Sequence, residues 1–285
     1  MAVWRVFAHR GARAHAPENS WTALVLAQQS GAHGWETDVR LTRDLVPVLV
    51  HDHTLYRTSD WAVSRPARTG LLSRLSFSDL LGADFGSWFA SQDPFGTVAS
   101  GAIDDTILSS LAATRVLRLE TALAFAAKHD FLTNIELKDQ YGVFADRTVV
   151  NAVLEAVHRS GIPSELVLFS SFRPAYLRLV RDLAPQMKTA LLAVRTPPRV
   201  RGVLRKLGAA AYHPHREGLS SELVQQLRGD GFDVHVFTVN TAVEAHQWHA
   251  AGASGIFTDF PRQMVQTFSS PSRPPPLSAL CFAHT

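Results

Sequence analysis

The sequence predicts an α/β fold, a closed (β/α)8 barrel with a small insertion after an N-terminal β-hairpin. Three observations predict it: short apolar, β-branched runs alternate with segments of helical period, eight such runs occur, and the chain has 285 residues. A barrel of this kind takes about 250 residues, and the alternation of strand and helix is typical of a parallel sheet. A doubly wound open sheet shares the alternation, but eight units favour closure.

The elements follow one another regularly along the chain. The expected strands are residues 3–8, 34–41, 132–138, 166–171, 189–194, 209–213, 234–239 and 255–259. The expected helices lie near residues 20–30, 120–129, 146–160, 173–183, 199–207, 220–229 and 241–251. Alternation of strands and helices of this kind indicates βα units, in which each helix connects two parallel strands.

Three segments depart from this alternation. Residues 46–51 form a further strand so soon after 34–41 that it must return antiparallel, as a hairpin. Residues 53–118 are too long for an ordinary loop and combine glycines with aromatics, which predicts an insertion at the barrel mouth that covers the substrate. Residues 269–285 are rich in proline and serine, so we expect a tail outside the 1–268 barrel domain.

Composition excludes several classes of function. Apolar residues make up 46% and charged residues 19% of a chain with net charge +3, and the arginines are scattered, so we expect no nucleic-acid partner. No apolar run reaches the length of about 18 residues that a membrane span needs. The single cysteine, Cys281, cannot form an intramolecular disulfide, and the N-terminus lacks the features of a signal peptide, so we expect a cytoplasmic protein.

The first strand ends in His9, Arg10 and Gly11, at the end of the barrel where active sites lie. A histidine there can exchange protons near neutral pH, and an arginine can grip two phosphate oxygens. The second hairpin strand ends in His51, which can pair with His9 across a phosphate. His213 is a weaker candidate, whereas we assign structural roles to His53, His215 and His235, and to the segment 17–20 before the first helix.

Acidic side chains alternate along two expected strands. Glu36 and Asp38 are two residues apart and therefore share a face, as do Glu136 and Lys138. Like charges repel strongly when buried, unless a proton or a cation compensates them. Carboxylate oxygens suit Mg²⁺ or Ca²⁺, so Glu36, Asp38 and Glu136 predict a site for one divalent cation. An internal Glu136–Lys138 ion pair is the alternative.

Together these residues resemble the glycerophosphodiester phosphodiesterase family over residues 8–261. The resemblance is carried by ordered motifs, each weak alone: 9–11 (HRG), 17–20 (PENS), 35–39 (WETDV), 46–52 (VPVLVHD), 55–58 (LYRT), 135–138 (IELK), 169–172 (FSSF), 237–240 (FTVN) and 255–261 (GIFTDFP). Phe237 stands where the family usually has tryptophan and Ser20 where threonine is common, and Arg118-Leu119-Glu120 lacks the usual proline.

The resemblance implies a TIM-type barrel and hydrolysis of glycerophosphodiesters to glycerol 3-phosphate and an alcohol. It implies that His9 and His51 are catalytic, that Glu36, Asp38 and Glu136 hold the cation, and that Arg10, Lys138 and Phe237 bind substrate. Two other functions stay open: a phospholipase D-like lyase that acts on lysophospholipids and releases a cyclic phosphate, and a non-catalytic barrel that binds phosphodiesters.

Overall fold

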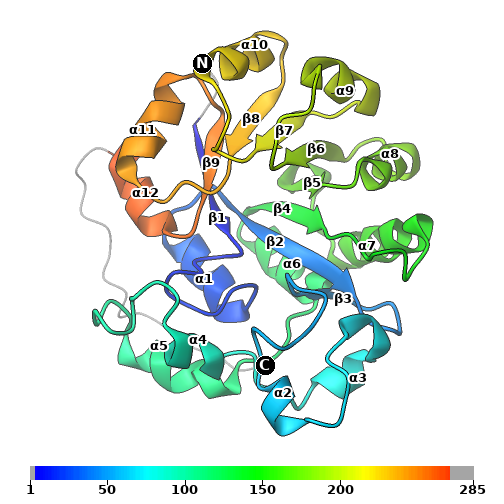
Figure 1. Ribbon diagram of the computed structural model, residues 1–285, viewed down its shortest axis with the longest axis vertical. Helices are drawn as coiled ribbons and strands as arrows, with labels where there is room; N and C mark the ends of the chain where they lie inside the picture. The colour runs from blue at the N-terminus through cyan, green and yellow to red at the C-terminus, as the bar shows by residue number, and fades with distance from the viewer. Residues whose placement is uncertain (1–3, 270–285) are drawn as a thin grey trace.

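The computed structural model describes residues 4–269 and confirms the closed barrel (Figure 1). Eight parallel strands follow the order β1-β9-β8-β7-β6-β5-β4-β2, and β1 pairs with β2 to close the ring. The barrel strands are β1 (Arg5–His9), β2 (Gly34–Leu41), β4 (Leu132–Leu137), β5 (Val167–Ser171), β6 (Lys188–Ala193), β7 (Ala211–Pro214), β8 (Asp233–Val236) and β9 (Gly255–Thr258). Their apolar positions form the core together with the surrounding helices.

The hairpin is confirmed by the short strand β3 (Pro47–Leu49), which pairs antiparallel with β2. In the register Val39 lies opposite Leu49, so the chain after β3 returns toward the part of β2 that carries Glu36 and Asp38. The backbone N–H of Val50 donates to the carbonyl of Asp38 at 3.1 Å, which continues the pairing beyond β3. His51 therefore follows a segment that is hydrogen-bonded to β2.

Helices surround the barrel and connect its strands. They are α1 (Trp21–Gln29), α6 (Leu119–Lys128), α7 (Asp146–Ser160), α8 (Pro174–Leu183), α9 (Val200–Leu207), α10 (Ser221–Gly229), α11 (Ala242–Ala250) and α12 (Pro261–Phe268), with the 3-10 turn η3 (Ser164–Leu166) before β5. Helix α12 was not predicted from the sequence; it begins with proline in its first turn, a position that tolerates proline. Ser20 caps α1, because its side chain accepts from the backbone N–H of Ala23.

The segment 53–118 folds into short helices gathered on one side of the barrel, beside α1 and β3 (Figure 1). They are α2 (Trp61–Ser64), η1 (Leu72–Arg74), α3 (Phe77–Leu80), α4 (Ser87–Gln92), α5 (Asp105–Ser110) and η2 (Leu111–Ala113). Trp61 is fully buried in a small core with Leu55, Leu72 and Leu80, and Val48 of β3 joins that core. The insertion is thus built onto the hairpin by apolar packing.

Within residues 4–269, no helix combines the length and apolar character needed to cross a bilayer. The expected tail, apart from Ser269, lies outside the described residues, as does Val3 of the first expected strand.

Candidate active site

A cavity of about 250 Å³ opens at the carboxyl ends of the barrel strands. Side chains of the strands and of the residues that follow them line it: His9, Arg10, Glu36, His51, Asn134, Glu136, Lys138, Phe172, Leu192, His215, Phe237, Thr238 and Phe257. This set includes all the site residues predicted from the sequence except Asp38, which pairs with Arg10 and Lys138, and the weaker candidate His213. The cavity therefore brings together residues spread from position 9 to position 257.

His9 is held by a carboxylate that the sequence analysis did not single out. Its Nδ1 lies 2.7 Å from Oδ1 of Asp259, and Asn240 donates to the other oxygen of Asp259 at 2.7 Å. Although burial opposes ionisation, His9 and Arg13 hold the pKa of Asp259 at about 2, so the carboxylate is charged at neutral pH. It accepts a hydrogen bond from the Nδ1–H of His9, so the other ring nitrogen, Nε2, carries the lone pair.

Burial lowers the pKa of His9, and the nearby charges of Arg10 and Arg13 lower it further, against the opposing effect of Asp259. The ring is therefore neutral near pH 7. A neutral imidazole whose Nδ1 is protonated presents Nε2 as a proton acceptor.

His51 has an arrangement of the same kind. Its Nδ1 lies 2.6 Å from Oδ1 of Asp52, whose other oxygen accepts from Arg57 at 2.6 Å. The hydrogen bond from His51 holds the pKa of Asp52 well below its usual range. His9 and His51 thus each pair with a carboxylate through the same ring nitrogen.

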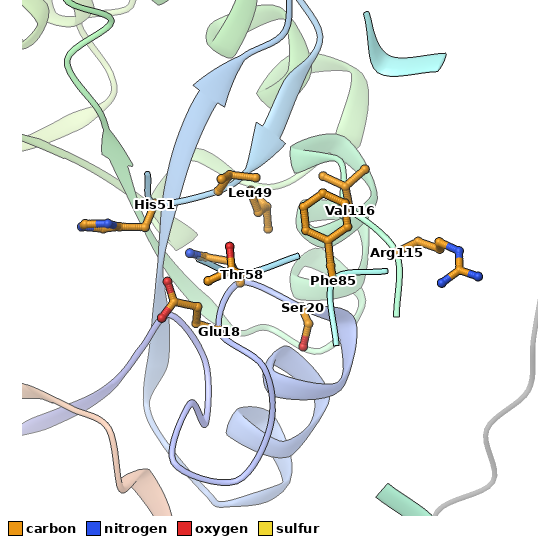
Figure 2. Close-up of a pocket in the computed structure, with 10 residues that line it drawn as sticks. Glu18, Ser20, Leu49, His51, Thr58, Phe85, Arg115 and Val116 are labelled. Atoms are coloured by element: carbon orange, nitrogen blue, oxygen red, sulfur yellow. The ribbon is translucent and has the colours of Figure 1, made fainter. Parts of the chain in front are cut away.

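Next to His51 lies a small pocket of about 10 Å³, which Figure 2 shows. Glu18 and Ser20 line it together with Phe85 and Val116 of the insertion. That volume is on the order of one water molecule. The ring of His51 points away from Phe85 and Val116 (Figure 2).

The three predicted carboxylates converge. Glu36, Asp38 and Glu136 are all buried, and each offers an oxygen within 4.8 Å of the others. Asp38 lies opposite Glu136 in the register of β2 and β4, which explains the approach. Burial raises the pKa of Glu36 well above its ordinary value, and the charges of Asp38 and Glu136 raise it further. One Glu36 oxygen accepts from the backbone N–H of Arg10, and the other, Oε1, is buried with no hydrogen-bond partner.

Two cations balance part of this charge. Lys138 Nζ lies 2.7 Å from Glu136 and 3.4 Å from Asp38, and Nε of Arg10 lies 3.2 Å from Asp38. Although burial opposes it, Arg10 and Lys138 hold the pKa of Asp38 well below its usual range. Burial raises the pKa of Glu136 in spite of Lys138. The predicted Glu136–Lys138 pair therefore exists, but among the described residues neither cationic side chain forms an ion pair with Glu36.

Glu18 and Asn19 enter the site, although the sequence analysis gave their segment a structural role. Asn19 donates to Asp38 at 2.8 Å and accepts from the backbone of Asp38 at 3.2 Å. Glu18 is buried and binds the guanidinium groups of Arg10, Arg13 and Arg57. Although burial opposes it, these arginines lower the pKa of Glu18 to about 2. The sequence contained one indication of this role, because Glu18 lies only eight residues after Arg10, which follows the first strand.

The turn after β1 requires glycine. Gly11 has a positive φ of 83°, and a Cβ there would lie 2.7 Å from Ala23 of α1. This close approach lets the chain turn back at once, so that the backbone N–H of Arg10 points at Glu36.

The minor histidines are distributed differently from the expectation. His213, the weaker candidate, is fully buried inside the barrel, where its Nε2 lies 3.2 Å from His235 Nδ1. It does not line the cavity, whereas His215, expected to be structural, does. Residues 213 and 215 share a face of the extended chain, and the second lies about 7 Å nearer the barrel mouth. His235 is buried beside Phe7 and is structural, as expected.

The aromatic side of the cavity opposes the carboxylates. Phe237 lines the cavity with Phe172 and His215, and its ring centroid lies 6.1 Å from that of Phe172 and 5.5 Å from that of His215. These rings provide an apolar wall for the carbon skeleton of a small molecule.

The insertion does not supply this wall. Among the described residues that line the cavity, none belongs to 53–118. Its contacts with the site come from the side: Arg57 binds Glu18 and Asp52, Phe95 stacks against Arg13, and Thr97 donates to the carbonyl of Ala14. The insertion therefore does not cover this cavity as expected, and its apolar core is anchored on β3.

Comparisons with known proteins agree with this geometry. The model of the glycerophosphoryl diester phosphodiesterase family matches residues 9–263. An uncharacterized protein of Bacillus subtilis (strain 168) is 31% identical over 91% of this chain and 96% of its own length. A glycerophosphodiester phosphodiesterase of Bacillus altitudinis is 30% identical over 92% of this chain and 97% of its own. The structure of an Oleispira antarctica phosphodiesterase with its product sn-glycerol-3-phosphate superposes with a TM-score of 0.80, at 26% identity, covering 94% of this chain and 98% of that one.

Proposed function

This chain belongs to the glycerophosphoryl diester phosphodiesterase family and is a phosphodiesterase, and we propose that it uses His9, His51 and one divalent cation to hydrolyse glycerophosphodiesters to glycerol 3-phosphate and an alcohol. The observation that carries the proposal is the convergence of three buried carboxylates and two carboxylate-bound histidines in one cavity at the strand ends. A barrel that only bound phosphodiesters would not need both histidine–carboxylate pairs.

The carboxylates fit a hard cation such as Mg²⁺ or Ca²⁺. Glu36 Oε1 is a buried oxygen with no partner, and Glu36, Asp38 and Glu136 bring ligand oxygens within 4.8 Å of one another. Oxygen ligands of this kind are what these ions prefer. Arg10 and Lys138 compensate Asp38 and Glu136, which leaves the charge of Glu36 for the cation. When bound, the cation would withdraw charge from the phosphate oxygens and stabilise the additional charge of the transition state.

Arg10 and Lys138 would position the phosphate from the protein side. Both line the cavity, and both are already fixed by carboxylates, so they lose little freedom when a phosphate oxygen approaches. Although burial opposes it, Asp38 and Glu136 raise the pKa of Lys138, which keeps its ammonium charged.

His9 would act as the general base and His51 as the general acid. The lowered pKa of His9 favours a neutral ring, and Asp259 keeps the proton on Nδ1, so Nε2 accepts a proton from the attacking hydroxyl. His51, held by Asp52, would give a proton to the oxygen of the departing alcohol. If the attacking hydroxyl belongs to the glycerol of the substrate, the first product is a cyclic phosphate, which water then opens by the reverse proton transfers.

Turnover of glycerophosphocholine, followed by detecting both glycerol 3-phosphate and cyclic phosphate, tests the proposal. Glycerol 3-phosphate as the final product supports hydrolysis. Cyclic phosphate as the only phosphorus-containing product would instead assign a lyase, and binding without turnover would assign a non-catalytic barrel.

A further inference from the structure

A second hollow, larger than the catalytic cavity, lies next to it. This groove has a volume of about 450 Å³, and Arg40, His53, Arg74, Gln140 and Tyr141 line it together with leucine side chains of β2 and η1. Tyr141 is 68% exposed although it is a large aromatic residue. No residue assigned above to catalysis or cation binding lines the groove.

The groove contains a buried positive charge without a negative partner. Arg40 is only 4% exposed, and its guanidinium donates to two backbone carbonyls, those of His51 and Asp139, both at 2.8 Å. Its remaining contact is with the ring of Tyr141, 5.6 Å away. In the described part of the chain Arg40 forms no ion pair, and its NH2 nitrogen has no hydrogen-bond partner. A guanidinium stays charged in proteins, and a buried charge is costly unless an opposite charge meets it.

A second arginine of the lining carries the same charge as Arg40. Arg74 is exposed, and no side-chain ion pair ties it down within residues 4–269. None of the residues that line the groove is an aspartate or a glutamate. Two guanidinium groups with no acidic side chain between them disfavour a cationic occupant and favour an anionic one.

The alternation of the strands connects the groove with the catalytic cavity. Glu36, Asp38 and Arg40 are spaced two residues apart on β2, so they share one face, and Arg40 lies about 7 Å beyond Asp38. Lys138 lines the cavity and Gln140 lines the groove, two residues further along the chain. The backbone N–H of Lys138 donates to the carbonyl of Val39 at 3.3 Å, so the segments that follow Val39 and Lys138 begin side by side.

We propose that this groove receives the alcohol part of the substrate and selects glycerophosphodiesters whose alcohol carries an anionic group, a carboxylate or a phosphate. The inference rests on the proposed function, because it assumes that the phosphodiester lies in the catalytic cavity. The anion of the alcohol pairs with Arg40 and Arg74, and the leucines and Tyr141 contact its carbon skeleton.

Two matched pairs of substrates test the selection. Glycerophosphoserine differs from glycerophosphoethanolamine by one carboxylate, and glycerophosphoinositol 4-phosphate differs from glycerophosphoinositol by one phosphate. We expect kcat/KM to be about tenfold higher for the anionic member, which is the fold-change for one charge-assisted hydrogen bond. A preference in the first pair alone assigns a carboxylate, and in the second pair alone a phosphate; either supports the proposal.

Variants then locate the preference. Arg40→Gln should bring the ratio of the two kcat/KM values close to one. Any displacement of His51, whose carbonyl Arg40 holds, lowers both members of a pair alike, so the ratio isolates the groove. Arg74→Glu, at an exposed position, should lower the ratio several-fold, because it removes a cation from the lining and adds an anion. Arg178→Glu, an equal charge change at an exposed position on α8, should not alter the ratio.

The outcomes are separable. Equal kcat/KM within both pairs for the unmodified protein, or a preference that survives both Arg40→Gln and Arg74→Glu, would overturn the groove assignment and leave the proposed function standing. A preference that Arg178→Glu abolishes equally would assign it to the overall charge and would also overturn the groove. Failure to cleave any of the four substrates would refute the proposed function, and the groove assignment with it.

Discussion

Replacing Asp259 by asparagine separates the catalytic role of this carboxylate from its structural one. Asparagine keeps the shape and loses the charge that fixes His9 through Nδ1. The pKa of Asp259 is about 2 in the folded protein against an ordinary value of 3.8, and this difference corresponds to roughly 2 kcal/mol of stability. Because the pKa is lowered on folding, that stabilisation is present above about pH 4 and is lost as the pH falls toward 2. The variant should therefore be less stable at pH 7, and the gap should close below pH 4.

The effect on activity should be larger. A wrong tautomer of His9 removes the proton acceptor from the cavity, and one acid–base group contributes about 10²–10⁴-fold to the rate. Asp259 also raises the pKa of His9, so without its charge the neutral ring persists to lower pH. We expect the acidic limb of the kcat/KM profile on glycerophosphocholine to move to lower pH in the variant. A merely structural change would lower the rate without moving the limb.

The assay compares kcat/KM from pH 4 to pH 9, and thermal unfolding from pH 2 to pH 7, for the original protein, Asp259→Asn and Asp182→Asn. Asp182 is 61% exposed on α8, so its replacement should change neither measurement appreciably. A folded Asp259→Asn variant with normal turnover and an unmoved acidic limb would refute the role of Asp259 in positioning His9.

Three further results are expected. His9→Ala and His51→Ala should each lower turnover about 10²–10⁴-fold while the protein stays folded by circular dichroism, and normal turnover in either would remove that histidine from the mechanism. Chelation should abolish turnover, added Mg²⁺ or Ca²⁺ should restore it, and the cation should raise the unfolding temperature of the original protein more than that of Glu36→Gln; full activity of metal-free protein would contradict this. Glu18→Gln should lower the free energy of unfolding by about 3–5 kcal/mol in chemical unfolding, because three arginines would lose a buried counter-charge. The control is Glu120→Gln, which removes the exposed ion pair with Arg159; a smaller destabilisation by Glu18→Gln than by this control would contradict the prediction.

The sequence predicted the barrel because most of its strands are buried on both faces and form short apolar runs, as in β9, and because most helices between them follow a helical period, as in α7. It also predicted the convergence of Glu36, Asp38 and Glu136, since residues two apart on a strand point to the same face. These are local rules. The small helices of 53–118 follow no long period and depend on packing around Trp61, so the bounds of the insertion could be predicted but not its helices or its placement beside the barrel.

Partners brought together by closure were harder to predict. Asp259 is 250 residues from His9, and nothing in the neighbourhood of either residue indicates the contact. The same holds for Arg40, whose guanidinium reaches the carbonyl of Asp139 across 99 residues. Glu18 was within reach of sequence reasoning, because it lies 8 residues from Arg10, but its segment also had the pattern of a helix cap, and the cap explained only Ser20.

The strand pairing of the barrel accounts for the contacts of His9. Ala8 lies opposite Thr258 where β1 meets β9, so the next residue of each strand, His9 and Asp259, come side by side. His9 lies opposite Glu36 where β1 meets β2. Closure at β1 is therefore what places His9 between Asp259 on one side and Glu36 on the other. A change that weakened the β1–β9 pairing should consequently reduce activity before it reduces global stability, since it would separate His9 from Asp259 while the other seven strands remained paired.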